Sequence, residues 1–230
     1  MSFLNLRRPI LSCKQEALDY QDRQGLLTIN LQIKNISLFS GFYTRIDQIF
    51  LLWGLICAAI FLTAQFSHLS WVSQAIFWSI LTALGSLLMI IMTYFWVRVE
   101  RLRWVLSLWV ILMLGGVIVT DLGIFLGIGE ILIHLCHIWL GLSAVGYLFT
   151  GLGMNSRAFM ISSAIHLVGI LLLPYCFSWQ FLTTGLLMMA NLIFLAETQW
   201  DMRSPIENYA LLSEEQKQFN QQQQQLRQVS

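Results

Sequence analysis

The chain has 230 residues, of which 57% are hydrophobic and only 11% are charged, and its mean hydropathy is +0.68. Soluble domains carry about 25% charged residues, so this composition excludes a water-soluble globular protein. The formal net charge of +1 leaves no basic field for nucleic acid. The four cysteines show no C-x-x-C spacing, which predicts neither a disulfide framework nor a thiolate metal site; they are Cys13, Cys57, Cys136 and Cys176.

Residues 1–45 are expected to form a cytoplasmic N-terminal segment. Within it, Leu27–Lys34 alternates apolar and polar residues, which is typical of a half-buried strand. A lone strand is not stable, so it would need a partner edge or the membrane surface. A helix fits the same residues equally well, with one apolar face made of Leu26, Ile29, Ile33 and Ile36.

Six apolar stretches follow, each near the length of about 20 residues that a helix needs to cross a bilayer core. They predict an all-α fold, a polytopic bundle of six transmembrane helices over residues 46–200. The stretches are Ile46–Phe66, Val72–Val97, Trp104–Thr120, Ile131–Gly151, Ala158–Phe177 and Trp179–Thr198. The third is short, and its helix can continue through Gly123–Ile128.

The last segment, residues 201–230, is polar and contains the glutamine run Gln221–Gln225. Such low-complexity composition predicts a disordered cytoplasmic tail or a short helix.

The positive charges predict the orientation, because cytoplasmic loops retain an excess of Lys and Arg. The first, third and fifth loops contain neither residue, whereas the N-terminal segment, both even loops and the tail do. The residues that make this pattern are Arg7, Arg8, Lys14, Arg23, Lys34, Arg45, Arg98, Arg101, Arg103, Arg157 and Arg203. Both termini are therefore predicted to be cytoplasmic. An aromatic belt at the membrane surfaces is predicted from Trp53, Trp71, Trp96, Trp104, Trp179 and Trp200.

Ionisable side chains inside spans are costly, so each is a candidate for function. Glu130, His134, His137, Gly141 and Ala144 share one helical face of the fourth span at about 100° per residue. An acid precedes them at the same boundary, and two polar residues lie at similar depth in the last two spans. The resulting candidate polar face comprises Asp121, Glu130, His134, His137, His166 and Asn191.

Small and hydroxyl residues on helix faces predict close packing between spans. A His166–Asn191 hydrogen bond is the simplest structural role for these two residues. The residues predicted to pack helices together are Ser79, Thr82, Ser86, Gly141, Ala144, Ser162 and Gly169.

The polar face offers few routes to a cofactor. Glu130, His134 and His137 could converge with Asp121 on one ion, yet acids are ordinary in outer loops, and we assign no metal ligands. Haem is disfavoured, because His137 and His166 differ in depth by roughly 8 Å. The aromatic content of 13% permits pigment or lipid contacts without indicating one, so the cofactor is unknown.

The run Gly141-Leu-Ser143-Ala144 loosely resembles the G-x-S-G/A motif of rhomboid intramembrane proteases. His166 lies at the depth expected of a base, but Ser143 points roughly 160° away from the histidine face. Rhomboids also carry their histidine on the sixth span, not the fifth. We therefore assign no catalytic residue and expect a non-enzymatic protein.

The stretch Trp139–Gly151, followed by Arg157 and His166, resembles small six-helix membrane proteins of unknown function in photosynthetic bacteria. The resemblance covers the last three spans and transfers no functional residue. It implies a thylakoid or bacterial inner membrane location, beside photosynthetic or respiratory complexes.

Three functional hypotheses follow. The first is a non-enzymatic accessory or assembly factor for a larger membrane complex, with the lipid bilayer and other integral membrane proteins as partners. The second is a small proton- or ion-coupled transporter that uses the candidate polar face. The third is a haem- or metal-binding membrane oxidoreductase.

Overall fold

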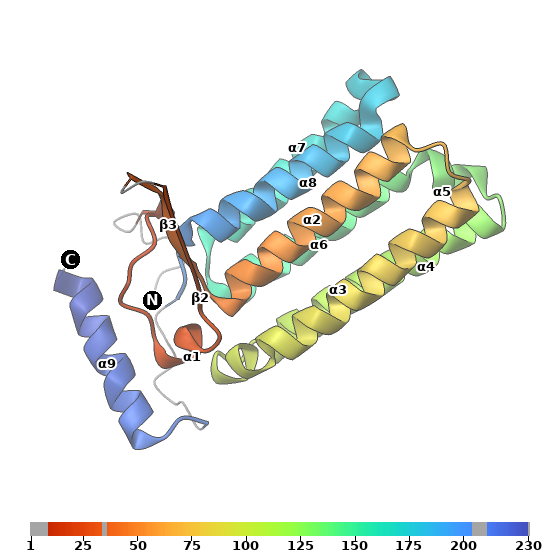
Figure 1. Ribbon diagram of the computed structural model, residues 1–230. Coiled ribbons are helices and arrows are strands. Elements are labelled where there is room, and N and C mark those ends of the chain that lie inside the picture. Colours follow the sequence, from red (N-terminus) through yellow and green to blue (C-terminus); the bar gives the residue numbers. More distant parts are fainter. Residues whose placement is uncertain (1–8, 34–35, 204–210, 230) are drawn as a thin grey trace.

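The computed structural model describes residues 9–33, 36–203 and 211–229, and within these ranges the chain is mostly helical (Figure 1). The α-helices are α1 (Tyr20–Arg23), α2 (Arg45–Phe66), α3 (Trp71–Val99), α4 (Arg103–Phe125), α5 (Gly129–Ile133), α6 (Leu135–Met154), α7 (Arg157–Leu172), α8 (Gln180–Glu197) and α9 (Glu214–Val229). A 3-10 helix, η1 (Leu173–Trp179), joins α7 to α8, and the strands are β1 (Leu11–Ser12), β2 (Leu27–Ile33), β3 (Ile36–Tyr43) and β4 (Gln199–Trp200). Arg7, Arg8 and Lys34, which contribute to the predicted orientation, lie outside the described residues.

Five helical stretches of the described chain are long and apolar enough to cross a membrane. They are α2, α3, α4, α6 and the continuous stretch Arg157–Glu197, which contains α7, η1 and α8. The predicted helical, membrane-type fold is therefore confirmed. Helix α4 ends at Phe125, so the third apolar stretch does continue beyond Thr120.

The stretch Arg157–Glu197 turns back on itself at η1. Pro174 lies at the start of η1, and Cys176 within it has a non-helical backbone with φ −112° and ψ 34°. Proline removes a helix hydrogen bond and its ring clashes with the preceding turn, so α7 ends here. Helices α7 and α8 consequently lie side by side (Figure 1). They occupy the residues predicted for the fifth and sixth spans, with lengths of 16 and 18 residues.

The long helices close into a ring. Helix α2 packs against α3 and α8, α6 packs against α4 and α7, and the contacts α3–α4 and α7–α8 complete it. In Figure 1 the α3–α4 pair stands apart from the group formed by α2, α6, α7 and α8.

Tryptophan rings that rest on glycines join the α3–α4 pair to the other helices. A Cβ added to Gly146 of α6 would lie 2.5 Å from the Trp109 ring of α4. A Cβ on Gly85 of α3 would likewise lie 3.4 Å from the Trp53 ring of α2. Trp109 also donates its indole N–H to Thr150 Oγ1 at 3.0 Å. These glycines admit a large ring between neighbouring helices because they carry no side chain.

The terminal segments meet at one end of the bundle (Figure 1). Strand β1 pairs antiparallel with β4, so Leu11 lies opposite Trp200. Strand β2 pairs with β3 from Leu27 opposite Tyr43 to Ile33 opposite Ile36. Of the two alternatives for Leu27–Lys34, the strand is the one formed, and β3 supplies its partner edge. The glutamine run lies in α9, the helical alternative for the tail.

Buried polar contacts fasten α9 to α1. Asn220 is fully buried; its side chain accepts from the Tyr20 backbone N–H at 2.7 Å and donates to Gln21 at 3.0 Å. Arg227 forms an ion pair with Asp19 at 2.6 Å. The two ends of the sequence therefore form one polar layer.

Asp201 joins this layer to the start of α7. Its carboxylate accepts from Ser156 Oγ at 3.0 Å, from Arg157 Nε at 2.7 Å and from the Ala158 backbone N–H at 3.0 Å. Burial by itself would raise the pKa of Asp201, but these donors outweigh burial and lower the pKa below its ordinary value. The carboxylate acts as a helix cap supplied from a distant part of the chain.

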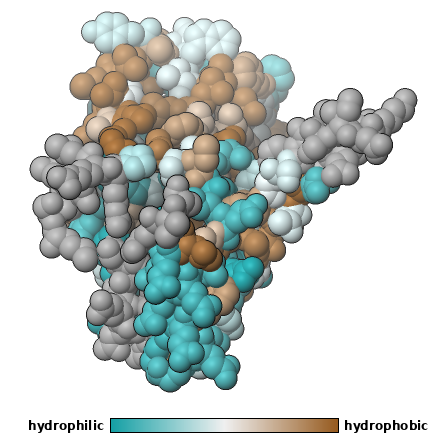
Figure 2. All heavy atoms as spheres, turned by 90° about the vertical axis from the view of Figure 1, so that its left-hand side faces the viewer, coloured by the Kyte–Doolittle hydropathy of each residue, from teal (hydrophilic) through white to brown (hydrophobic). Residues whose placement is uncertain are grey.

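Charge and hydropathy divide the surface in the same way. Residues 9–44, 99–103, 155–157 and 198–229, as far as they are described, form what we call the polar end. Every described Lys and Arg lies in it or within two residues of it. Figure 2 looks onto this end and shows hydrophilic atoms gathered where α9 lies, below a hydrophobic flank. The outer face of α3 is apolar, with Ile76, Ile80 and Ile91 exposed, as expected of a surface that faces lipid.

Candidate functional site

The candidate polar face does not form one continuous helical stripe. Helix α5 ends at Ile133, and His134 has φ −107° and ψ 7° at the break before α6. Glu130 and His134 are exposed, and His134 Nδ1 lies 2.8 Å from the Glu130 carbonyl oxygen. The His134 and His137 rings meet edge to face at 5.4 Å between centroids. The expected single face from Glu130 to Ala144 is thus wrong at its outer end, because helical periodicity does not continue through a break.

Asp121 bonds to a different neighbour from the one expected. Ser79 Oγ of α3 lies 2.9 and 3.1 Å from the two carboxylate oxygens of Asp121 on α4. Ser79 is one of the predicted packing residues, so this contact joins the two helices of the α3–α4 pair. It leaves Asp121 as a link within that pair.

His166 is fully buried and bonds to its own helix. Its Nδ1 donates to the Ser162 carbonyl oxygen at 2.8 Å, because a carbonyl can only accept. The ring lies 4.9 Å from the Tyr147 ring, and Nε2 has no hydrogen-bond partner. The predicted His166–Asn191 bond is therefore absent, and Asn191 Nδ2 is also unpartnered.

The remaining candidates lead to no catalytic or metal centre within the described residues. No group of three or more His, Cys, Asp or Glu side chains there could hold a metal ion, and all four cysteines are free. Ser143 is buried but lines an apolar cavity that His166 does not reach. The packing predictions fare differently at two glycines: a Cβ on Gly169 would lie 2.6 Å from Leu187, whereas on Gly141 the nearest atom is 4.0 Å away.

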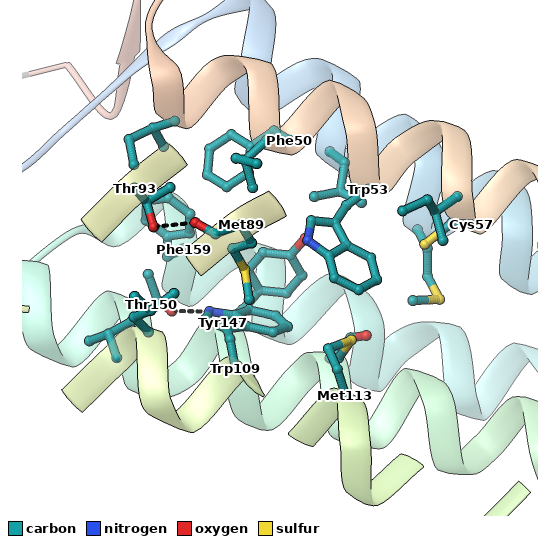
Figure 3. Close-up of a pocket in the computed structure, with 18 of the residues that line it drawn as sticks. Phe50, Trp53, Cys57, Met89, Thr93, Trp109, Met113, Tyr147, Thr150 and Phe159 are labelled. Carbon is teal, nitrogen blue, oxygen red and sulfur yellow. Dashed lines mark hydrogen bonds between the residues drawn. The ribbon is translucent and has the colours of Figure 1, made fainter. Parts of the chain in front are cut away.

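The largest feature inside the bundle is an apolar cavity of about 140 Å³ (Figure 3). It lies among α2, α3, α4, α6 and α8, with Phe159 of α7 at its wall. Along α2 its lining runs from Ile46 to Phe61, about 22 Å at the helical rise. A void of this size costs about 3 kcal/mol when it stays empty. No histidine lines it among the described residues.

Aromatic side chains dominate the cavity wall. In Figure 3, Trp53 points from α2 towards Trp109 and Tyr147 on the facing helices. Trp53 Nε1 is buried without a hydrogen-bond partner. The predicted aromatic belt is consequently only half right. Trp71, Trp104 and Trp179 are exposed, whereas the ones that line the cavity are Trp53, Trp96 and Trp200.

A second, polar chamber adjoins the cavity at the polar end, and its volume is also about 140 Å³. Ile46, Trp96 and Trp200 line both spaces. The ionisable residues that line the polar chamber are Lys14, Asp19, Asp22, Asp47, Glu100 and Arg203.

Most of these charges are paired. Lys14 lies 2.9 Å from Asp47, and Arg203 Nη2 donates to the Glu100 carbonyl oxygen at 2.5 Å and lies 3.9 Å from Glu100 Oε2. Glu100 Oε2 is buried and has no hydrogen-bond partner. Burial raises the pKa of Glu100, although the bond from Gln21 opposes it.

Asp22 is held by a tryptophan and by no cation in an ion pair within the described residues. The Trp96 indole N–H donates to Asp22 Oδ1 at 2.7 Å. Burial raises the pKa of Asp22 to about 7; the Trp96 bond lowers it, and the charges of Asp19 and Glu100 raise it. Trp96 thus presents an apolar ring to the cavity and its polar N–H to the chamber.

Sequence reasoning did not find the cavity or the chamber. The available signal was the set of tryptophans outside the span ends, such as Trp109 and Trp139. Comparison with protein-family models, curated proteins and solved structures finds no match to this chain.

Proposed function

We propose that the chain is a six-span membrane protein of a bacterial inner or thylakoid membrane, and a non-enzymatic accessory or assembly factor for a larger membrane complex. Both termini lie on the cytoplasmic side in this proposal. The reversal at η1 supports six spans, because α7 and α8 run side by side. The location of the described Lys and Arg at the polar end supports the orientation.

An open two-stranded sheet is the observation that carries the accessory role. Strands β2 and β3 pair only with each other among the described residues, and Thr28 and Asn30 of β2 are exposed. A two-stranded sheet is marginal in water, and its free edges can pair with another chain. A partner strand or surface would complete the sheet beyond the membrane.

The test is a pull-down from gently solubilised membranes with a tagged chain, followed by native-gel sizing. We expect wild type to migrate in an assembly larger than its own detergent particle. Lysines on an edge strand oppose pairing, so the double variant Thr28→Lys/Asn30→Lys should release the partner.

The matched control places two lysines on exposed positions of α9, Gln221→Lys/Gln225→Lys. It adds the same charge to the same end and should retain the assembly. A wild-type chain that runs as a single small particle would refute the proposal, and so would equal loss of the partner in both double variants.

A further inference from the structure

The apolar cavity has the shape of a hydrocarbon chain. Its volume of about 140 Å³ extends over about 22 Å of α2, so the passage is long and narrow. A flat macrocycle does not fit such a passage, but a flexible chain does. Apolar cavities of similar volume stay dry and take up apolar molecules.

One end of this passage opens towards polar groups. Ile46, Trp96 and Trp200 form the boundary that the cavity shares with the polar chamber. Tryptophan favours the level in a membrane where apolar and polar surroundings meet. Trp96 spans that level, since its ring lines the cavity and its N–H bonds to Asp22 at 2.7 Å.

The chamber offers hydrogen-bond acceptors. Asp22 has Trp96 as its only printed hydrogen-bond donor, and Glu100 Oε2, in a residue that is only 3% exposed, has no hydrogen-bond partner. A buried acceptor without a donor is costly and calls for a physical explanation. Four carboxylates against two cations line the chamber, so an anionic group is disfavoured there.

We infer that the bundle binds one hydrocarbon chain of a lipid in the cavity, and that the lipid's polar group donates hydrogen bonds from hydroxyl or ammonium groups to Asp22 and Glu100. The chain replaces the void and the donors satisfy the carboxylates. Neither the open sheet nor the proposed partner complex enters this inference.

The test uses a one-chain lipid with hydroxyl donors, glycerol mono(9,10-dibromostearate), whose bromines quench tryptophan fluorescence at short range. It is titrated into the purified full-length chain in detergent, beside methyl 9,10-dibromostearate, which has the same chain and no donor. We expect saturable quenching by the glyceride at equimolar probe. The methyl ester should bind at least about tenfold more weakly, because it leaves the acceptors unpaired.

Two matched variants locate the chain. Ser143→Leu adds a side chain into the cavity from α6 and should abolish saturable quenching, whereas Ser107→Leu makes the same change at an exposed position of α4 and should preserve it. Elution volume and helical circular dichroism check folding; if Ser143→Leu fails that check, Met113→Phe fills the same cavity from α4.

Quenching that rises linearly with probe in wild type means partition into the micelle and overturns the inference. Equal affinity for the glyceride and the methyl ester overturns the assignment of the donors to the chamber. Saturable quenching that survives both cavity-filling variants overturns the assignment of the chain to the cavity.

Discussion

Polar side chains find their partners differently at the polar end and inside the bundle. At the polar end they bond across the whole sequence, as Asp19 does with Arg227 and Asn220 does with Gln21. Inside the bundle a hydroxyl usually bonds back to its own helix. Thr93 donates to the Met89 carbonyl at 2.7 Å, and the same pattern joins Thr120 to Gly116 and Thr150 to Gly146.

The difference follows from the two solvents. Lipid cannot hydrogen-bond a stray polar group, so a hydroxyl is satisfied most readily by the carbonyl one turn earlier. Such a bond fastens nothing to a neighbouring helix. Inside the bundle, shape therefore does most of the holding, as where Trp109 lies on Gly146. At the polar end, water competes for every group, and only specific buried pairs fix the segments.

The largest effect should come from disturbing the shape of the bundle. Gly146→Ala places a Cβ 2.5 Å from the Trp109 ring, and such overpacking costs about 1–3 kcal/mol. We expect a lower unfolding midpoint in a detergent–SDS titration followed by circular dichroism. Gly141→Ala on the same helix is the control, because its nearest atom is 4.0 Å away; it should be neutral or slightly more stable. Equal midpoints for the two variants would contradict the role given to the Trp109–Gly146 contact.

At the polar end, Asp201→Asn should cost about 1–2 kcal/mol, because it weakens bonds from Arg157 and Ala158 to a charged acceptor. The pKa of Asp201 is lowered in the folded chain. The stabilisation is therefore fully present above the ordinary pKa of 3.8 and is lost as the pH falls through the lower folded value. Thermal unfolding in detergent between pH 6 and pH 3 measures this.

The control for Asp201 is the exposed Glu16→Gln, which should leave the unfolding temperature and its dependence on pH unchanged. An Asp201→Asn chain that loses stability with falling pH as wild type does would place the titrating group elsewhere.

The smallest effect is expected for His166→Leu, within about 1 kcal/mol of wild type. His166 bonds only its own helix, and one ring nitrogen has no hydrogen-bond partner, so an apolar replacement leaves no partner on another helix unsatisfied. Asn220→Leu at the polar end is the contrast and should cost about 2 kcal/mol, since it strands the Tyr20 N–H and Gln21. Both are compared by the same SDS titration, and a large loss for His166→Leu would revive it as a functional residue.

Local composition predicted a good part of the fold. Hydropathy is a property of the segment itself, so the apolar stretches appear as helices, and Pro174 marks the turn between α7 and α8. The alternation in Leu27–Lys34 predicted a strand in need of a partner, and β3 is that partner. The candidate site was predicted less well, because periodicity says which residues share a face only while a helix continues. The break at His134 ends that argument.

By itself, the sequence determined the helical membrane-type fold, the segregation of Lys and Arg into alternate loops, and the polar character of both terminal segments. All three depend on residue type and on neighbours in the chain. Only the tertiary structure decided that Trp53 and Trp96 line a cavity, that Asp22 faces a polar chamber beside it, and that Asn220 fastens the tail to α1. These depend on space left between helices and on contacts across up to 200 residues, which no local pattern encodes.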